Sequence, residues 1–310
     1  MTIIDTLTVE RLTGLDSYLA AQILGQHEVI AQITELLQRS FCGIRLPRRP
    51  VASMLFLGPT GVGKTDTAEL LTERLFGSRE KLIRLDMSEY MTVDSIDILR
   101  GANMTEDGIL GRYYDRTEGA GVLLFDEIEK GHRLMLDLLL QILSAARFTT
   151  AAGRTLDLRG YVVVATSNIG SEMLMESRTR DRETLVRRTV QVATQDMRPE
   201  IYARFDVVSV FNRLNDEVLE EIAKLHLERS LEIVRRQGHD ITLSPGVLEF
   251  VLREGWSSEF GARPLQQAAL RALGSAIVPR LLEGEGRAVS GRIEYDRRKN
   301  RCELVSAVSV

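Results

Sequence analysis

The sequence predicts an α/β protein with a mostly parallel β-sheet flanked by helices, followed by a smaller, mainly helical C-terminal domain. Three observations lead to this prediction. Up to about Asn212, short apolar runs alternate with segments of helical periodicity. After that point, longer amphipathic segments dominate. A glycine-rich phosphate-binding pattern directly follows the first apolar run, which is where an α/β sheet places its ligand.

The strands expected in the first part of the chain are short apolar runs that stop at glycine or polar residues. They span residues 51–57, 82–85, 122–125, 161–165 and 207–211. Apolar residues at helical spacing indicate amphipathic helices between them, most clearly at 64–76 and 134–142. Strands that alternate with helices form a mostly parallel sheet, because each helix returns the chain to the edge from which the strand began.

The chain after about residue 212 is predicted to be mainly helical. Helix-spaced apolar residues start at Val218, Val247 and Leu265. Two short runs, 291–295 and 301–305, flank a polar turn and indicate a closing β-hairpin. The expected organisation is an N-terminal helical extension over 1–22, a large α/β domain over 23–211, and a small helical domain ending in the hairpin over 212–310.

Composition narrows the possible functions. The chain has 310 residues, 44% hydrophobic and 27% charged, so a packed core is expected. Its net charge of −4 gives no global basic footprint for nucleic acid. Cys42 and Cys302 lie far apart and the four histidines are scattered, which argues against a disulfide framework and a zinc site. No leader pattern or long apolar run occurs, so we expect a cytoplasmic protein without membrane insertion.

The most specific motif is Gly58-Pro59-Thr60-Gly61-Val62-Gly63-Lys64-Thr65, which has the spacing of a P-loop. Its glycines let backbone N–H groups point at phosphate oxygens, and the following helix directs its N-terminus at the same anion. Lys64 supplies a charge to the β- and γ-phosphates, and the Thr65 hydroxyl can ligate Mg²⁺. The strand before and the helix after it favour ATP and Mg²⁺ as ligands over a simple glycine-rich turn.

An acidic pair, Asp126-Glu127, ends the apolar run 122–125. Asp126 is expected to hold Mg²⁺, directly or through water, and Glu127 to orient and polarise the attacking water. Helix caps can look similar, but the position downstream of a P-loop favours the catalytic interpretation. Asn168 follows the strand 161–165 and is a candidate contact to the γ-phosphate or to that water, although Ser-Asn-Ile-Gly also makes an adequate turn.

Taken in order, these segments resemble the Clp family of AAA+ ATPases, in particular the second ATPase domain of ClpB-type unfoldases. The resemblance runs from about Leu24 to Leu304. It rests on Ile23-Leu24-Gly25-Gln26, the P-loop with Phe56-Leu57 before it, Leu85-Asp86-Met87-Ser88-Glu89-Tyr90, Phe125-Asp126-Glu127-Ile128-Glu129-Lys130 with His132, and Thr166-Ser167-Asn168-Ile169-Gly170-Ser171. It implies an AAA+ P-loop fold with a helical lid domain. It also implies Ile23 and Leu24 beside the adenine, and Asn168 as the sensor-1 residue.

The resemblance also gives roles to two arginines. The segment Arg198 to Asp206 resembles the arginine-finger segment, in which Arg204 would reach the γ-phosphate bound by a neighbouring subunit. Phe260-Gly261-Ala262-Arg263-Pro264-Leu265 resembles the sensor-2 motif, in which Arg263 would contact phosphate in its own subunit. Without the resemblance, each would be an ordinary surface arginine. A finger that acts in trans implies a homo-oligomer, and the family forms hexamers, so we expect an ATP-favoured hexamer.

Three departures from the family bear on function. The chain carries a single ATPase unit. The stretch Gly101-Ala102-Asn103-Met104-Thr105-Glu106-Asp107-Gly108 is shorter than the family's pore loop and has no aromatic residue to grip a polypeptide. Residues 171–197 contain no Ile-Gly-Phe or Ile-Gly-Leu tripeptide, so we do not expect a ClpP-type peptidase as a partner.

Three functions remain open at this point. The intact catalytic set favours an oligomeric ATPase ring that remodels or disassembles a specific protein complex. The altered pore loop favours a nucleotide-switched ring or filament scaffold that regulates a partner complex without threading it. A nucleic-acid motor is disfavoured by the Clp-type motifs and by the net charge of −4. The sequence does not indicate which protein is the partner.

Overall fold

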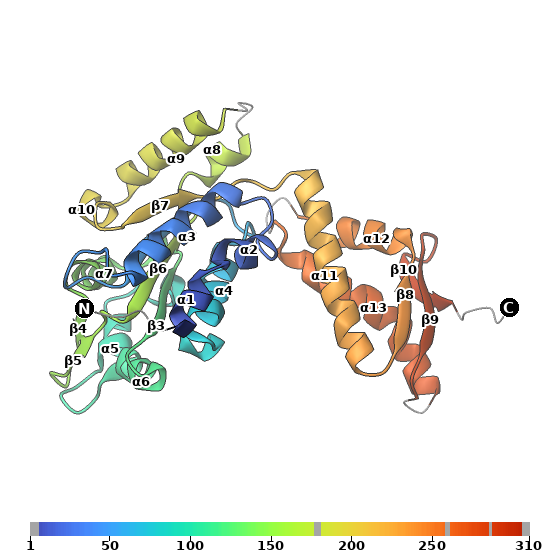
Figure 1. The fold of residues 1–310 in the computed structure, drawn as a ribbon, viewed down its shortest axis with the longest axis horizontal. Coiled ribbons are helices and arrows are strands. Elements are labelled where there is room, and N and C mark those ends of the chain that lie inside the picture. The colour runs from blue at the N-terminus through green and yellow to red at the C-terminus, as the bar shows by residue number, and fades with distance from the viewer. Residues whose placement is uncertain (1–5, 177–180, 258–260, 285–286, 306–310) are drawn as a thin grey trace. The chain divides into compact units, whose positions relative to one another are not determined.

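The structure is a computed structural model that describes residues 6–176, 181–257, 261–284 and 287–305. The chain folds as two compact units (Figure 1). Unit 1 comprises the chain up to Pro59 together with Gly63–Arg213, and unit 2 comprises Thr60–Val62 together with the chain from Leu214.

Unit 1 is built around a five-stranded parallel sheet with the strand order β2-β3-β6-β1-β7. Its strands are β1 (Ala52–Leu57), β2 (Leu82–Asp86), β3 (Gly121–Asp126), β6 (Tyr161–Ser167) and β7 (Val207–Val210). Every residue of β1, β3 and β6 is buried, because helices cover both faces, and this explains their mostly apolar sequences. The predicted α/β class with a mostly parallel sheet is confirmed.

Successive side chains of a strand point to opposite faces, so the two faces of the sheet have separate cores. Leu55 and Leu57 of β1 lie in the larger core, which includes residues of six helices. These helices are α5 (Ser95–Arg100), α6 (Gly108–Thr117), α7 (Arg133–Ala145), α8 (Ser171–Glu176), α9 (Arg182–Asp196) and α10 (Pro199–Tyr202). The sheet thus positions α5 to α10 together on one side.

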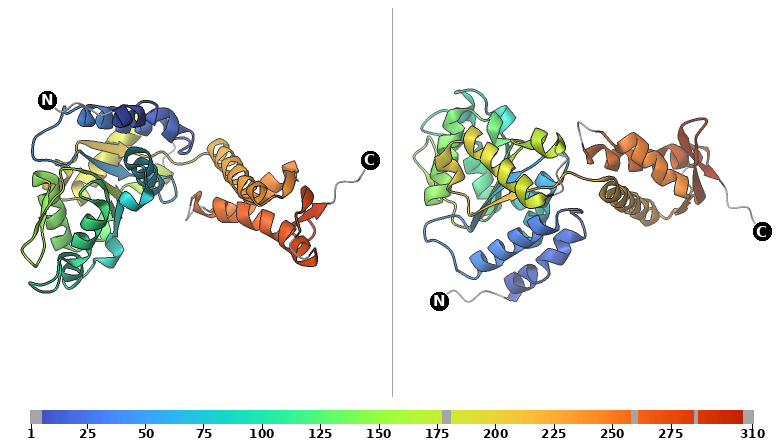
Figure 2. Two further views of the ribbon diagram at one scale, coloured as in Figure 1. Left: turned by 60° about the horizontal axis from the view of Figure 1, so that its bottom comes forward. Right: turned by 90° about the horizontal axis from the view of Figure 1, so that it is seen from above.

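The other face of the sheet is covered by the N-terminal helices and the helix that follows the P-loop. Helix α3 contacts β1 and β7, and helix α4 contacts β3 and β6. Figure 2 shows these blue helices on one side of the sheet and the green helices on the other. The helices of this face are α1 (Thr6–Leu12), α2 (Leu15–Ala20), α3 (His27–Phe41) and α4 (Lys64–Phe76).

Unit 1 also contains short elements that the sequence did not predict. A small antiparallel hairpin follows α7, and its residues Phe148 and Leu156 are buried in the larger core. Its strands are β4 (Arg147–Thr149) and β5 (Thr155–Asp157). Three single-turn 3₁₀ helices are η1 (Arg79–Lys81), η2 (Met87–Glu89) and η3 (Ile128–Lys130). Strands of three residues are too short to leave a periodic signal.

Unit 2 combines three helices with a three-stranded sheet of order β10-β9-β8. Its elements are α11 (Asp216–Arg236), β8 (Asp240–Leu243), α12 (Pro245–Gly255), α13 (Arg263–Glu283), β9 (Ser290–Asp296) and β10 (Arg301–Val305). β9 and β10 form the expected antiparallel pair, and β8 adds a parallel third strand that the sequence did not predict. Ile241 is the one fully buried residue of β8, so its apolar pattern is weak. No helix of the described residues is long and apolar enough to cross a membrane.

Candidate nucleotide-hydrolysis site

The P-loop joins the carboxyl end of β1 to the N-terminus of α4. Gly58 and Gly63 have φ values of 144° and 100°, which L side chains rarely adopt. A Cβ on Gly58 would also lie 3.0 Å from the Phe211 carbonyl oxygen, so both the space and the backbone conformation require glycine there. The loop turns sharply into α4. The first N–H groups of this helix lack helical partners, as at every helix start, and can therefore bind an anion.

Lys64 is buried at the mouth of this loop. Its ammonium group donates hydrogen bonds to the carbonyl oxygens of Gly58 and Pro59 and to Asn168 Oδ1, the last at 3.0 Å. The carbonyl contacts hold the lysine across the loop, and the Asn168 contact joins the P-loop to the end of β6. The positive charge of Lys64 is thus fixed between the carboxyl ends of β1 and β6.

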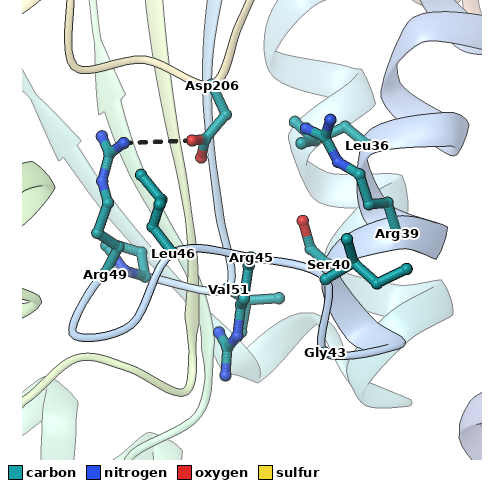
Figure 3. Close-up of a pocket in the computed structure, with 11 residues that line it drawn as sticks. Leu36, Arg39, Ser40, Gly43, Arg45, Leu46, Arg49, Val51 and Asp206 are labelled. Atoms are coloured by element: carbon teal, nitrogen blue, oxygen red, sulfur yellow. Dashed lines mark hydrogen bonds and ion pairs between the residues drawn. The ribbon is translucent and has the colours of Figure 1, made fainter.

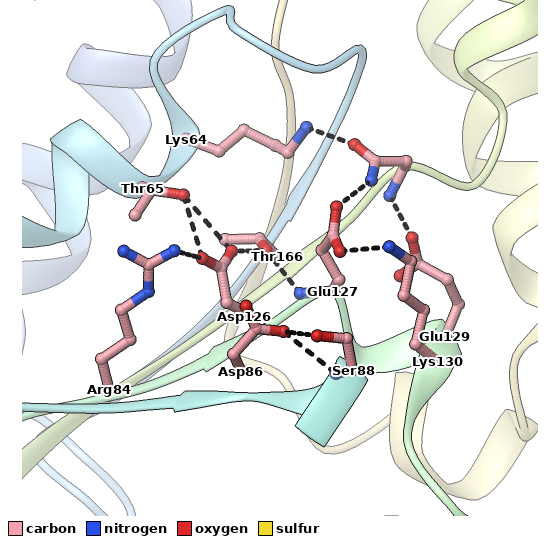
Figure 4. A network of polar contacts seen from close by, with 11 residues as sticks. Lys64, Thr65, Arg84, Asp86, Ser88, Asp126, Glu127, Glu129, Lys130 and Thr166 are labelled. Carbon is pink, nitrogen blue, oxygen red and sulfur yellow. Dashed lines mark hydrogen bonds and ion pairs between the residues drawn. The ribbon is translucent and has the colours of Figure 1, made fainter. Parts of the chain in front are cut away.

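Asp126, the last residue of β3, is buried and its carboxylate is held on all sides (Figure 4). The hydroxyl of Thr65 lies 3.3 Å from one carboxylate oxygen, and the hydroxyl of Thr166 lies 2.5 Å from it. Arg84 of β2 donates to the other oxygen at 2.6 Å. The site thus places Thr65 beside Asp126, while Arg84 supplies the positive charge that the buried carboxylate needs.

Glu127 follows directly and has a left-handed backbone, with φ and ψ both 56°. Such a conformation costs energy in a residue with a side chain and persists only where neighbours impose it. Its N–H donates to Thr166 Oγ1 at 2.9 Å, and its carboxylate accepts from Asn168 Nδ2 at 3.0 Å. Lys130 pairs with the second carboxylate oxygen at 2.6 Å. The Glu127 carboxylate is therefore held between Asn168 and Lys130.

Two ionisable groups beside these carboxylates have shifted pKa values. The hydrogen bond to Glu127 raises the pKa of Lys130, so this lysine stays charged. Burial alone would raise the pKa of Asp86, but hydrogen bonds from Ser88, with the charges of Arg84 and Lys130, outweigh it and lower that pKa. At neutral pH the site therefore contains fixed charges of both signs.

The segment expected beside the adenine also lies against the P-loop. Ile23 is buried, and its methyl groups lie 3.5 Å from where a Cβ on Gly63 would be. Leu24 is half-buried. Gln26 exchanges hydrogen bonds with the backbone of Asn212, at 2.8 and 3.0 Å, which ties this segment to the residues after β7.

The two predicted arginines lie in different units. Arg204 follows α10 in unit 1, and its side chain is exposed. In the described part of the chain, its guanidinium makes neither a hydrogen bond nor an ion pair. Arg263 is the first residue of α13 in unit 2 and is also exposed. Phe260, from the same predicted motif, lies outside the described residues.

The residues 101–108, expected to replace a pore loop, form a compact loop between α5 and α6. Asn103 Oδ1 accepts from the N–H of Thr105 at 2.9 Å, and Asn103 Nδ2 donates to Glu106 at 3.2 Å. A Cβ on Gly101 would lie 2.1 Å from the Glu106 carbonyl oxygen, so the two ends of the loop almost touch. Met104 is 87% exposed at its tip. Of residues 171–197, expected to lack a peptidase-docking tripeptide, 177–180 lie outside the described residues.

Sequence reasoning assigned no role to three residues that hold the acidic pair. Thr166 bridges Asp126 and Glu127, Arg84 pairs with Asp126, and Lys130 pairs with Glu127. Thr166 is a polar residue near the end of the buried strand β6, two residues before Asn168, which is a usable signal in hindsight. Arg84 is the one charged residue within the run Leu82–Leu85, which likewise marks it as unusual for a strand.

The residues present fit a nucleoside triphosphate and Mg²⁺. The P-loop backbone and Lys64 offer donors and charge for phosphate, and Thr65 and Asp126 offer a hydroxyl and a carboxylate oxygen of the kind that Mg²⁺ takes. Among the described residues, no group of three or more His, Cys, Asp and Glu is placed to hold a metal. A Mg²⁺ ion at Thr65 and Asp126 would therefore take its other ligands from phosphate and water, as this ion commonly does.

Two family matches cover most of the chain. Residues 49–208 match the family described as AAA domain (Cdc48 subfamily), and residues 214–294 match the C-terminal, D2-small domain of ClpB protein. The chain belongs to the Clp family of AAA+ ATPases. As a Clp-family chain it belongs to a group of ATP-binding proteins, and Asn168 and the Asp126-Glu127 pair lie in the first matched region.

Curated Clp relatives are similar over most of this chain. Chaperone protein ClpB 1 of Synechococcus elongatus is 34% identical over 299 residues, which cover 93% of this chain and 34% of the relative. Chaperone protein ClpB of Leptolyngbya boryana is 38% identical over 281 residues, 88% of this chain and 32% of that protein. The ClpA homolog of Porphyra purpurea, an ATP-binding subunit of the ATP-dependent Clp protease, is 36% identical over 296 residues, 90% and 36% of the two chains.

Solved structures of Hsp104 have the same fold. The Saccharomyces cerevisiae Hsp104–ADP complex superposes with a TM-score of 0.85 at 27% identity, covering 96% of this chain and 52% of the Hsp104 chain. A closed state of Hsp104 with ATPγS and FITC-casein gives a TM-score of 0.84 at 27% identity. This Clp-family chain thus spans about a third of the length of its curated relatives and about half of Hsp104.

Proposed function

We propose that this chain is a Mg²⁺-dependent ATPase that works as a homo-oligomer and uses hydrolysis to remodel or disassemble a specific protein complex. The observation that carries the proposal is the hydrogen-bond network at the carboxyl edge of the sheet. Asn168 contacts both Lys64 and Glu127, and Thr166 contacts both Asp126 and Glu127. A phosphate-binding lysine, an acidic pair and an amide are therefore connected within one site.

Each residue has a role in this proposal. Lys64 and the N-terminus of α4 bind the β- and γ-phosphates, and Thr65 and Asp126 hold Mg²⁺, Asp126 directly or through water. Bound Mg²⁺ neutralises phosphate charge and acts as a Lewis acid. Glu127 accepts a hydrogen bond from the attacking water and polarises it, and Asn168 orients that carboxylate and the water. Ile23 and Leu24 contact the adenine, and Arg263 contacts phosphate from the lid domain.

The proposed oligomer follows from Arg204. Its guanidinium is exposed and, within the described residues, has no partner of its own, so it is available to a neighbouring copy. In that copy it would stabilise the charge that develops on the γ-phosphate. A ring of six is the arrangement that the family resemblance implies. The casein present in one Hsp104 structure supports a protein as the substrate of this chain.

The first test is the steady-state ATPase rate of the wild type and of Glu127→Gln over a range of protein concentrations. Glutamine keeps the shape of the side chain but is a poor base, so turnover should fall by a factor of order 10² or more while ATP binding persists. Wild-type specific activity should rise with concentration, because each site needs a neighbour's Arg204. Glu80→Gln is the matched control, since Glu80 is exposed and precedes the N-terminal end of β2, whereas the nucleotide site lies at the carboxyl ends of the strands.

A specific activity that does not depend on protein concentration would overturn the proposed shared site. A Glu127→Gln variant with wild-type turnover would overturn the role given to Glu127. For remodelling, the trapped Glu127→Gln protein is used as bait and the captured complex is then incubated with wild type and ATP. Disassembly that requires ATP supports the proposal. Capture of a complex that stays intact through many turnovers contradicts the remodelling role.

A second candidate is a nucleotide-switched ring or filament scaffold that regulates a partner without threading it. The observation that favours it is the loop 101–108, which is short, polar and closed by its own hydrogen bonds. Replacing Met104 and Glu106 together by alanine separates the two functions. A scaffold should keep its effect on the partner, whereas a threading ring should lose it. Arg204→Ala should abolish the effect in both cases.

A further inference from the structure

The backbone of Arg204 is held by hydrogen bonds, whereas its guanidinium makes none within the part of the chain that the structure describes. The Arg204 carbonyl oxygen accepts a hydrogen bond from the Arg49 guanidinium and lies 3.3 Å from Ser53 Oγ. The N–H of Arg204 donates to Ile201 at the end of α10. A side chain that must reach a neighbouring copy thus starts from a fixed backbone position.

Arg49 lies in the loop between α3 and β1, and its three guanidinium nitrogens bond to two segments of unit 1, helix α7 and residues 204–206. Its Nε donates to the Leu143 carbonyl oxygen of α7 at 3.1 Å, and another nitrogen lies 3.4 Å from the Asp206 carboxylate. Its third nitrogen donates to Arg204. The Arg49 side chain is only 15% exposed. A planar guanidinium can serve three acceptors at once, and an ammonium group cannot reproduce this geometry.

Asp206 completes the arrangement by joining the segment to β1. Its second carboxylate oxygen accepts from the N–H and the hydroxyl of Ser53, at 2.8 and 2.7 Å. The N–H of Asp206 donates back to the Ser53 carbonyl oxygen at 2.9 Å, one residue before the β1–β7 ladder begins. Residues 204–206 are therefore fixed to the strand whose other end carries the P-loop.

Arg49 and Asp206 face each other across one side of a cavity of about 500 Å³ (Figure 3). Arg39 of α3 lines the same cavity. Within the described residues, the Arg39 guanidinium makes neither a hydrogen bond nor an ion pair, so the side chains of the two arginines differ in their contacts although both line this cavity. This difference provides a matched control.

We propose that Arg49 is a positioning residue for Arg204: it fixes the backbone from which the arginine finger extends to the neighbouring copy. This inference rests on the proposed function of Arg204 in trans. Removing Arg49 leaves the P-loop, Asp126 and Glu127 of the same copy untouched but lets residues 204–206 move. A displacement of about 1 Å at a catalytic group can cost about 10²-fold in rate.

The first experiment compares the ATPase kinetics of Arg49→Ala, Arg49→Lys and Arg39→Ala with wild type. Arg49→Ala should lower kcat by about 10- to 100-fold and leave the affinity for a fluorescent ATP analogue unchanged, because only the trans group moves. Arg49→Lys should restore little of the lost kcat, since lysine keeps the positive charge but lacks the planar guanidinium that bonds three acceptors at once. Arg39→Ala should behave as wild type. In a double-mutant cycle, Arg49→Ala should add nothing to Arg204→Ala.

The second experiment mixes variants, because a trans defect can be repaired by a neighbour. Arg49→Ala subunits keep an intact Glu127, and Glu127→Gln subunits keep an intact finger. A mixture of these two impaired proteins should have more ATPase activity than the sum of the two alone, whereas Arg49→Ala mixed with Arg204→Ala should not. Circular dichroism melting of each variant confirms folding. If Arg49→Ala is unfolded at the assay temperature, Ser53→Ala and Arg49→Lys replace it in the same mixtures.

The mixtures also separate this inference from the proposed function. If Arg204→Ala plus Glu127→Gln fails to regain activity, then sites are not shared and the proposed trans mechanism is overturned together with this inference. If that mixture recovers but Arg49→Ala plus Glu127→Gln does not, then Arg49 acts on its own nucleotide site or on folding alone. That result overturns the positioning role and leaves the proposed function standing.

Discussion

Asp126 and Glu127 are adjacent in the chain, yet Thr166 and Asn168 give their carboxylates different surroundings. Thr166 donates to Asp126 and accepts from the N–H of Glu127, so one hydroxyl fixes the metal-side carboxylate and the strained backbone of the proposed base. Asn168 then holds the Glu127 carboxylate. In the proposed mechanism, the separation of metal binding by Asp126 from water activation by Glu127 therefore depends on one buried threonine.

Thr166→Val should therefore lower both stability and turnover. Valine has nearly the same shape but removes the acceptor for the part-buried N–H of Glu127, which costs about 1–3 kcal/mol. Urea unfolding midpoints and kcat measure the two effects. Thr72→Val is the control, because Thr72 is equally buried but bonds only to Ala68 within α4. Equal effects of the two substitutions on kcat would contradict the role given to Thr166.

The two cysteines should differ in reactivity. Cys302 is fully buried in unit 2, and burial raises the pKa of its thiol to about 11, whereas Cys42 is exposed. At pH 8, a thiol reagent should modify one cysteine per native chain and two in denaturant, since the thiolate is the reacting form. Because burial disfavours the thiolate, the neutral thiol of Cys302 favours the folded state. This contribution is fully present below the ordinary pKa of 9.0 and is lost as the pH rises through the folded-state pKa of about 11. Rapid native modification of both thiols would contradict this.

The loop 101–108 is held in place by the hairpin β4–β5. Arg154, beside β5, donates to Asp107 at 2.9 Å and to Asp115 of α6 at 3.0 Å, and Thr150 also donates to Asp107. The hydrogen bonds from Arg154 lower the pKa of both carboxyl groups. These ion pairs therefore contribute above the unfolded-state pKa of about 4 and are lost as the pH falls through the lower folded values.

Arg154→Ala should loosen this loop without unfolding unit 1. Hydrogen exchange of residues 102–107 at neutral pH should accelerate, because Asp107 loses its ion pair with Arg154 and keeps only the hydrogen bond from Thr150 to the hairpin. Arg159→Ala is the control, since within the described residues the Arg159 guanidinium bonds only to the carboxylate of Asp157 at the end of β5. Unchanged exchange in Arg154→Ala would show that the loop's internal hydrogen bonds suffice to hold it.

At the scale of the whole molecule, the proposed sites belong to an assembly. Light scattering with a non-hydrolysable ATP analogue should give a mass several times the chain's 34.8 kDa, because bound γ-phosphate gives the neighbour's Arg204 a partner. Lys64→Ala, which removes the phosphate-binding charge, should stay at the size seen without nucleotide. A monomer at micromolar protein with the analogue bound would count against the proposed oligomer.

The sequence by itself determined the fold class and the family, because both depend on contiguous patterns. Strand-length apolar runs predicted the parallel sheet, and the P-loop, the Asp126-Glu127 pair and the Leu85–Tyr90 segment are each read within a few residues of chain. The short strands β4, β5 and β8 were missed, since few of their residues are buried and the rest carry no periodic signal.

Only the tertiary structure decided which residues support the site. Arg49 bonds to Arg204 across 155 positions, and Thr166 meets Asp126 across 40. These contacts arise because the order β2-β3-β6-β1-β7 makes neighbours of strands that are distant along the chain. A sequence pattern specifies which residues a strand carries. The pairing of strands, which depends on burial over the whole sheet, decides which of those residues meet.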